Sequence, residues 1–111
     1  MRMPIFLIAV FLASSALAQD RTTYFLTGNQ LHEICSKDRA QAQAYLMGFN
    51  DGVALRDEVN KQLSFCPPST VKSGQFVDLI CQEFERQPGN RHWPASFIVH
   101  DALSRTWPCA Q

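Results

Sequence analysis

The sequence predicts an all-α protein, a small disulfide-stapled bundle of four helices that follows an N-terminal signal peptide. Two observations lead to this prediction. From residue 27 onward, apolar side chains recur at helical spacing, without the strict alternation that marks half-buried strands. All four cysteines lie downstream of the export signal: Cys35, Cys66, Cys81 and Cys109. An even cysteine count in a short exported chain favours disulfides, which support a domain whose core is small.

The signal peptide is expected to span residues 1–18 and the mature helical domain residues 19–111. Arg2 gives a short basic start, and the apolar run at residues 5–12 is too short to span a bilayer as a mature helix. Ala16-Leu17-Ala18 then supplies the small-x-small pattern that signal peptidase accepts. A buried N-terminal helix is disfavoured, because no polar residue divides the apolar run into faces. We therefore expect Sec-dependent export, cleavage after Ala18 and a periplasmic mature protein.

The charge balance of the mature domain narrows the classes of partner. Loss of Arg2 with the signal leaves nine basic and ten acidic residues, a formal charge of −1. Nucleic acids and anionic membranes are bound by clustered basic residues, and this composition offers no such cluster. No later apolar stretch approaches the length of about 18 residues that a membrane span needs. Neither nucleic-acid binding nor membrane insertion is therefore expected after cleavage.

The first two helices are predicted near residues 28–36 and from Asp38 to about Gln62. Thr27-Gly28-Asn29-Gln30 has the form of a capping box, in which the threonine hydroxyl and the glutamine amide each bind a backbone donor. Asp38 is suited to cap the second helix. One face of that helix is apolar, with Ala42, Leu46, Phe49 and Val53, whereas its later turns are expected to be solvated, with Asp57, Glu58 and Lys61.

Two glycines lie four residues apart on the second helix. Gly48 and Gly52 each cost about 1 kcal/mol relative to alanine in a helix interior, so a compensating gain is expected. Because they share one face, we predict tight packing of another helix against them, in preference to a ligand-binding role.

The last two helices follow a proline-rich loop at residues 64–69. Consecutive prolines end the helical pattern there, and a third helix is predicted from between Thr70 and Gly74 up to the turn at residues 87–90. Pro94 suits the first turn of a fourth helix, since its missing amide proton is not needed there. The core face of that helix has the expected spacing, with Ala95, Ile98, Val99, Ala102 and Leu103.

Four cysteines allow three pairings, and spacing alone does not choose among them. In an up-and-down arrangement the second and fourth helices run the same way and both end near a cysteine. We therefore prefer a bridge from Cys66 to Cys109, which leaves Cys35 to reach Cys81. A zinc site is disfavoured because there is no close pair such as C-x-x-C, and a thiol nucleophile is disfavoured by the even count.

The sequence offers few candidates for catalysis. His32, His92 and His100 are far apart and belong to no metal-binding motif such as H-E-x-x-H. His100 and Asp101 are adjacent on a helix, so their side chains point in different directions. No Gly-x-Ser-x-Gly elbow or phosphate-binding glycine loop is present. We expect a protein that is not an enzyme and that holds neither metal nor cofactor.

Several short motifs follow one another in a recognisable order. Phe25-Leu26-Thr27-Gly28-Asn29-Gln30-Leu31 precedes Cys35, and Gly48-Phe49-Asn50-Asp51-Gly52-Val53 lies in the second helix. The set continues with Phe65-Cys66-Pro67-Pro68, Ser73-Gly74-Gln75-Phe76, His92-Trp93-Pro94-Ala95 and Trp107-Pro108-Cys109. Over nearly the whole mature chain, this order resembles the Rap and Tai immunity proteins of type VI secretion systems. Phe49 stands where the family's Gly-Tyr-x-x-Gly-Val pattern has tyrosine.

The resemblance implies a periplasmic immunity protein that binds and inhibits a cell-wall amidase effector, with dimerisation through a helix face. An inhibitor of this kind needs a rigid exposed segment, since preorganisation lowers the entropy cost of binding. The proline-rich loop and the turn before the fourth helix are the candidates for contact. Their candidate residues are Phe65, Pro67, Pro68, His92 and Trp93.

Two alternatives stay open at this point. For Phe65 and Trp93, closing an end of the core is at least as good an explanation as contact with a partner. For the whole chain, the alternative is a stand-alone periplasmic helical protein with a stress or chaperone-like binding role and no toxin partner. An amidase gene beside this one would favour immunity.

Overall fold

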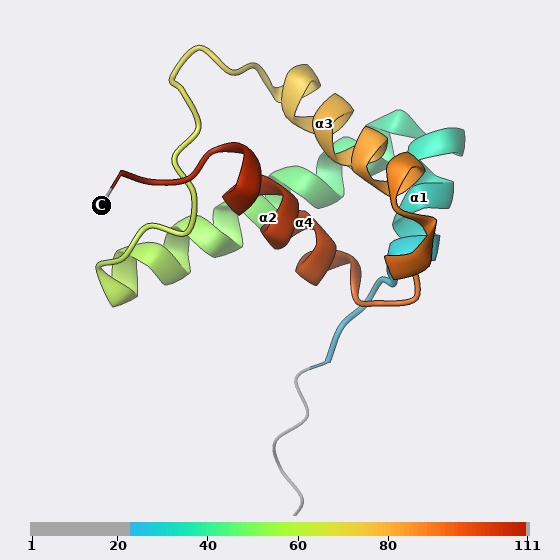
Figure 1. The fold of residues 1–111 in the computed structure, drawn as a ribbon, viewed down its shortest axis with the longest axis horizontal. Coiled ribbons are helices and arrows are strands. Elements are labelled where there is room, and N and C mark those ends of the chain that lie inside the picture. Colours follow the sequence, from blue (N-terminus) through green and yellow to red (C-terminus); the bar gives the residue numbers. More distant parts are fainter. Residues whose placement is uncertain (1–22, 111) are drawn as a thin grey trace, which may run out of the picture.

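The computed structural model describes residues 23–110, and within them the protein has four α-helices and one short 3-10 turn (Figure 1). The helices are α1 (Gly28–Lys37), α2 (Arg39–Asn60), α3 (Ser73–Arg86) and α4 (Ala95–Thr106), and the 3-10 turn is η1 (Pro88–Asn90). In this part of the chain the only extended pairing is an isolated bridge between Thr27 and Pro94. The expected all-α fold is therefore confirmed. The expected signal peptide, with its cleavage site after Ala18, lies outside the described residues.

Helix α1 begins with the capping box expected from the sequence. The Gln30 amide donates to the Thr27 hydroxyl over 3.2 Å, and the Thr27 amide donates to the Gln30 side-chain oxygen over 2.8 Å. A single residue, Asp38, separates α1 from α2, and its carboxylate accepts from the Gln41 amide. Because Asp38 ends one helix and caps the next, the two helices meet at a sharp corner.

Helix α2 is the longest, and its C-terminal half projects beyond the other helices (Figure 1). It ends at Lys61, whose backbone is left-handed with φ 54°. The chain then turns back through the proline-rich loop to α3. Helix α1 packs against α2, α3 and α4, while α3 also packs against α2 and α4.

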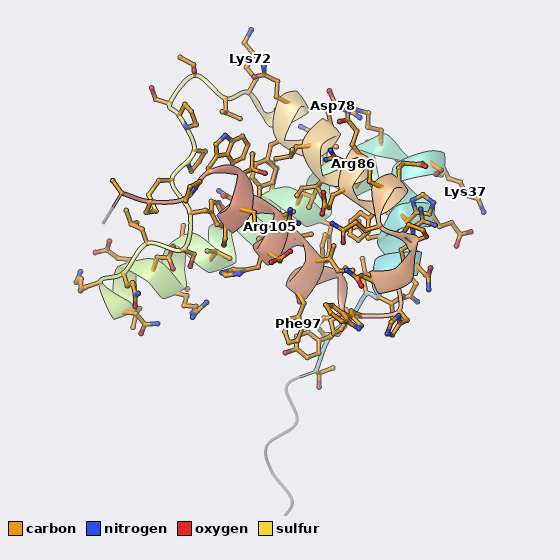
Figure 2. The ribbon with its side chains drawn as sticks, viewed as in Figure 1. Lys37, Lys72, Asp78, Arg86, Phe97 and Arg105 are labelled. Carbon is orange, nitrogen blue, oxygen red and sulfur yellow. A yellow bond between two sulfur atoms is a disulfide. The ribbon has the colours of Figure 1, made fainter. Side chains whose placement is uncertain are left out.

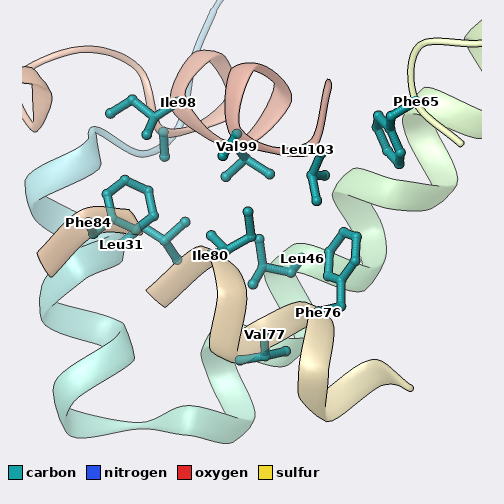
Figure 3. Close-up of a cluster of buried hydrophobic side chains, with 12 residues drawn as sticks. Leu31, Leu46, Phe65, Phe76, Val77, Ile80, Phe84, Ile98, Val99 and Leu103 are labelled. Carbon is teal, nitrogen blue, oxygen red and sulfur yellow. The ribbon is translucent and has the colours of Figure 1, made fainter. Parts of the chain in front are cut away.

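The core lies where α1, α3 and α4 meet the first half of α2 (Figure 3). Its fully buried large side chains come from all four helices: Leu31, Leu46, Val77, Ile80, Phe84, Val99 and Leu103. Burying one such side chain stabilises a fold by about 1.5–3 kcal/mol. The apolar face predicted for the fourth helix is buried as expected.

Two disulfides link segments that are distant in sequence. Cys35 at the end of α1 bonds Cys81 in α3, and Cys66 in the loop bonds Cys109 after α4. This is the pairing preferred from the sequence. An ion pair between Arg39 and Asp78 joins α2 to α3 close to the first bridge.

The structure corrects two expectations about α2. A Cβ atom added at Gly48 or Gly52 meets no atom within 4 Å among the described residues, so none of α1, α3 and α4 packs against that face. Asp57 is not solvated, because it is only 9% exposed. It faces the loop that turns back beside it, a tertiary contact that helical periodicity does not reveal.

Candidate partner-binding surface

The two segments predicted to contact a partner lie at opposite ends of α4. The exposed Pro67 and Pro68 belong to the loop that is tied to the C-terminal end of α4, where the Cys66 amide donates to the Trp107 carbonyl over 2.8 Å. His92 and Trp93 lie in the turn just before α4, and both are exposed. A helix of 12 residues is about 18 Å long, so the two segments form separate surfaces.

The structure places Phe65 in the core. Its side chain is 9% exposed and meets the His100 ring edge to face, with ring centroids 6.5 Å apart. A side chain this buried supports the loop from inside and offers little area to a partner. The alternative considered for Phe65, that it closes one end of the core, matches its position.

Asp57 fixes the start of the same loop. Its two carboxylate oxygens accept hydrogen bonds from the Ser64 amide, over 2.8 Å, and from the Ser64 hydroxyl, over 2.7 Å. The hydroxyl bond is the main reason why the pKa of Asp57 lies below its ordinary value. The Ser64 carbonyl in turn accepts from the Ser104 hydroxyl of α4. These contacts position the chain that leads to Pro67 and Pro68.

The turn that presents Trp93 is held by the N-terminus of α1. The Gly28 amide donates to the Trp93 carbonyl over 2.7 Å, and the Asn29 amide donates to the Arg91 carbonyl over 2.6 Å. The Ala95 amide donates back to the Leu26 carbonyl over 2.8 Å. Helix-start amides have no partner within their own helix, so α1 uses its free donors to anchor this turn.

Gly28 is the residue that permits this contact. A Cβ atom built there would lie 2.7 Å from the Arg91 carbonyl oxygen and 2.6 Å from the Ile98 Cδ1 atom. The glycine that begins α1 is therefore required for close approach, and not for an unusual backbone angle.

Trp93 forms one rim of a hollow between α2 and α4, which we call the aromatic groove. The groove has a volume of about 510 Å³. Its apolar lining is Phe49 and Val53 from α2 with Trp93 and Phe97 from the turn and α4, and its polar lining is Arg56, Ser96, His100 and Asp101. Trp93 is 47% exposed and Phe97 54% exposed. Figure 2 shows Phe97 at the edge of the molecule, where it meets Tyr24 edge to face with ring centroids 5.2 Å apart.

The charges on α4 are largely paired within the chain. Arg105 bonds Asp101 over 2.9 Å and Glu83 over 2.6 Å, and these bonds raise the pKa of Arg105, that to Glu83 most strongly. Glu83 is buried and also binds Arg86 and Gln87. Arg56 differs, because within residues 23–110 its guanidinium forms no ion pair or hydrogen bond.

The comparison with known protein families is decisive. A family model described as Rap1a immunity proteins matches residues 27–109, which is most of the chain. The chain belongs to the Rap1a immunity proteins. No curated protein and no solved structure gave a significant match. Members of such a family act by binding a protein effector, so a protein partner is the relevant ligand class for this Rap1a immunity protein.

The histidines of this Rap1a immunity protein are dispersed through the fold. His32 lies 4.0 Å from a Glu85 oxygen, His92 is on the surface turn, and His100 lines the groove. Between residues 23 and 110, no three His, Cys, Asp or Glu side chains are grouped to hold a metal ion. In the same stretch no helix is long and apolar enough to cross a membrane.

Sequence reasoning did not select Phe97 or Arg56 as candidates. A signal for Phe97 was available, because residue 97 falls outside the spacing of the core residues 95, 98, 99, 102 and 103 and therefore points away from the core. No comparable signal exists for Arg56. Arg56 is a candidate because α4 lies opposite it and because no carboxylate binds its guanidinium within residues 23–110. Both features depend on the tertiary structure.

Proposed function

We propose that this Rap1a immunity protein acts in the periplasm, where it binds and inhibits a cell-wall amidase delivered by a type VI secretion system. The observation that carries the proposal is the family match over residues 27–109. Two disulfides in a short chain support it, since disulfides persist in oxidising compartments. The ordered motifs quoted above, which resemble Rap and Tai proteins, favour an amidase over other effector classes.

The scaffold suits inhibition by direct obstruction. The surface segments are fixed by bonds to the core: Trp93 through the amides of α1, and Pro67 and Pro68 through Asp57 and the Cys66–Cys109 bridge. A fixed segment loses little conformational entropy when it enters a cleft, so more of the contact energy appears as affinity. We propose Pro67, Pro68, His92 and Trp93 as contact residues, with Phe65 supporting the loop from the core.

The test is rescue from lysis. Candidate amidases exported to the periplasm are expressed with and without this protein, and culture lysis and co-purification are measured. The expected result is that one amidase lyses cells alone, fails to do so with the protein present, and co-purifies with it. If no amidase is neutralised or captured, a stand-alone binding protein without a toxin partner becomes the better hypothesis.

We also propose that the protein dimerises through the outer face of α2. Gly48 and Gly52 have open space around them, and Leu55 and Val59 on the same face are 67% and 72% exposed. Two such faces allow two helix backbones to approach closely and cover their apolar side chains. This assembly would supply the compensating gain expected for the two helix-interior glycines.

A further inference from the structure

The aromatic groove combines apolar walls with exposed anchors that are already held in place. Phe49 and Val53 form the α2 wall and are half-buried, while Trp93 and Phe97 form the opposite rim and are about half exposed. The backbone of Trp93 is positioned by the bond from the Gly28 amide to its carbonyl, and the Phe97 ring meets Tyr24 edge to face. Tryptophan and tyrosine are enriched among residues that dominate binding energy, especially in pockets that exclude water.

The charges around the groove indicate what kind of segment fits it. Asp101 itself lines the groove, where its carboxylate is paired with Arg105, and the buried Asp57 accepts two hydrogen bonds from Ser64. Arg56 forms no ion pair or hydrogen bond with any residue from 23 to 110. His100 also lines the groove, but its ring nitrogen Nε2 is buried and has no hydrogen-bond partner in the same range, so it is not open to a ligand. Beside its apolar walls the groove therefore offers one guanidinium, that of Arg56, which lies in the field of Asp57 but has no direct bond to a carboxylate within residues 23–110.

We infer that the aromatic groove receives one segment of the effector, in which an aromatic or large aliphatic side chain stands beside an aspartate or glutamate. The apolar side chain fills the space between Val53 and Phe97, and the carboxylate binds the Arg56 guanidinium. Arginine is the side chain best suited to a bidentate bond with a carboxylate. This inference rests on the proposed function for the identity of the partner, but the recognition chemistry follows from the groove itself.

The first arm of the test uses the amidase that passes the rescue assay. Phe97→Ala and Arg56→Glu are each expected to weaken its binding about tenfold or more, measured by calorimetry with the full mature chain. Arg56→Lys keeps the charge and is expected to recover part of the loss. Lys37→Glu and Phe25→Ala are the matched controls, because both side chains are exposed, neither lines the groove and neither belongs to a proposed contact segment. Figure 2 shows Lys37 at an edge of the molecule away from Phe97.

The second arm needs no effector, so it separates failure of this inference from failure of the proposed function. The peptides acetyl-Gly-Phe-Asp-Gly-amide and acetyl-Gly-Phe-Lys-Gly-amide are titrated into the 15N-labelled mature protein. The aspartate peptide is expected to shift the amide signals of Ser96, Phe97 and His100, and the lysine peptide to shift them less. Arg56→Gln is expected to remove that difference between peptides, with circular dichroism showing an intact fold.

Four outcomes would overturn the inference. One is equal shifts with both peptides. Another is shifts confined to the loop at residues 64–72. The third is amidase binding by Phe97→Ala and Arg56→Glu that is as tight as in the controls. Loss of the dimer in the groove variants would instead make a second copy of this chain the occupant, which also contradicts the inference.

Discussion

Replacing Gly28 by alanine tests the proposal that α1 holds the turn that presents Trp93. The new Cβ would lie 2.7 Å from the Arg91 carbonyl oxygen and 2.9 Å from the Arg91 Cα, well inside the ordinary contact distance of about 3.5–4.0 Å. Ile98 can move its terminal methyl group, but the Arg91 atoms belong to the backbone. The turn must therefore shift away from α1 by several tenths of an ångström.

The cost has two parts. Overpacking at a tight site costs about 1–3 kcal/mol. The shift also lengthens the hydrogen bonds from the Gly28 and Asn29 amides, each of which contributes about 0.5–1.5 kcal/mol. Alanine returns less than the roughly 0.5–1 kcal/mol that it gains in a helix interior, because Gly28 is the first residue of α1. We expect Gly28→Ala to lower the free energy of unfolding by about 2–3 kcal/mol.

Urea denaturation of the oxidised protein measures this change. Gly74→Ala is the matched control, because it makes the same chemical change in the first turn of α3, where the added Cβ meets nothing within 4 Å. That variant is expected to keep the wild-type stability or to gain up to about 1 kcal/mol. If Gly28→Ala is as stable as the wild type or as Gly74→Ala, the close approach of α1 to the turn is not a constraint and the reasoning fails.

Three further predictions follow from other contacts. Because the folded-state pKa of Asp57 is lowered, the stability that its carboxylate contributes is present above the ordinary carboxyl pKa of about 4 and is lost as pH falls through the folded pKa. Asp57→Asn should lower the free energy of unfolding by about 1.5–3 kcal/mol near pH 7 and should weaken the loss of stability on acidification. An unchanged loss of stability at acid pH would contradict this. Replacing both Cys66 and Cys109 by alanine should lower the free energy of unfolding by about 4 kcal/mol, because the bridge closes a loop with a sequence separation of 43. Calorimetry measures this loss of stability. Val59→Glu should convert the proposed dimer to a folded monomer, measured by sedimentation. If the variant sediments with the wild-type mass, the outer face of α2 is not the dimer interface.

Much of the fold follows from local chemistry that the sequence displays openly. The capping box at Thr27, the cap at Asp38 and the apolar spacing of α4 each depend on residues within one or two turns of one another. Local rules therefore place the helices to within a few residues. Helix ends are predicted less precisely. Pro94 was placed in the first turn of the fourth helix, but it stands just before α4 as its N-cap residue.

The parts that were not predicted depend on contacts between distant segments. Asp57 was expected to be solvated because its neighbours are charged, but Ser64 folds back to bind it. Gly48 and Gly52 were expected to admit a helix, but no atom of residues 23–110 lies within 4 Å of a Cβ added at either position. The aromatic groove needs α2 and α4 to lie opposite one another, so no window of sequence contains it.

The two disulfides interleave along the chain, and this order affects how the protein survives proteolysis. Cys35 bonds Cys81 and Cys66 bonds Cys109, so the second bridge begins before the first has closed. A single cut anywhere between Cys35 and Cys109 therefore leaves one covalently connected molecule, and a cut between Cys66 and Cys81 leaves both bridges spanning the break. A nicked copy keeps its helices tethered, and its surfaces stay together for as long as the bridges remain oxidised.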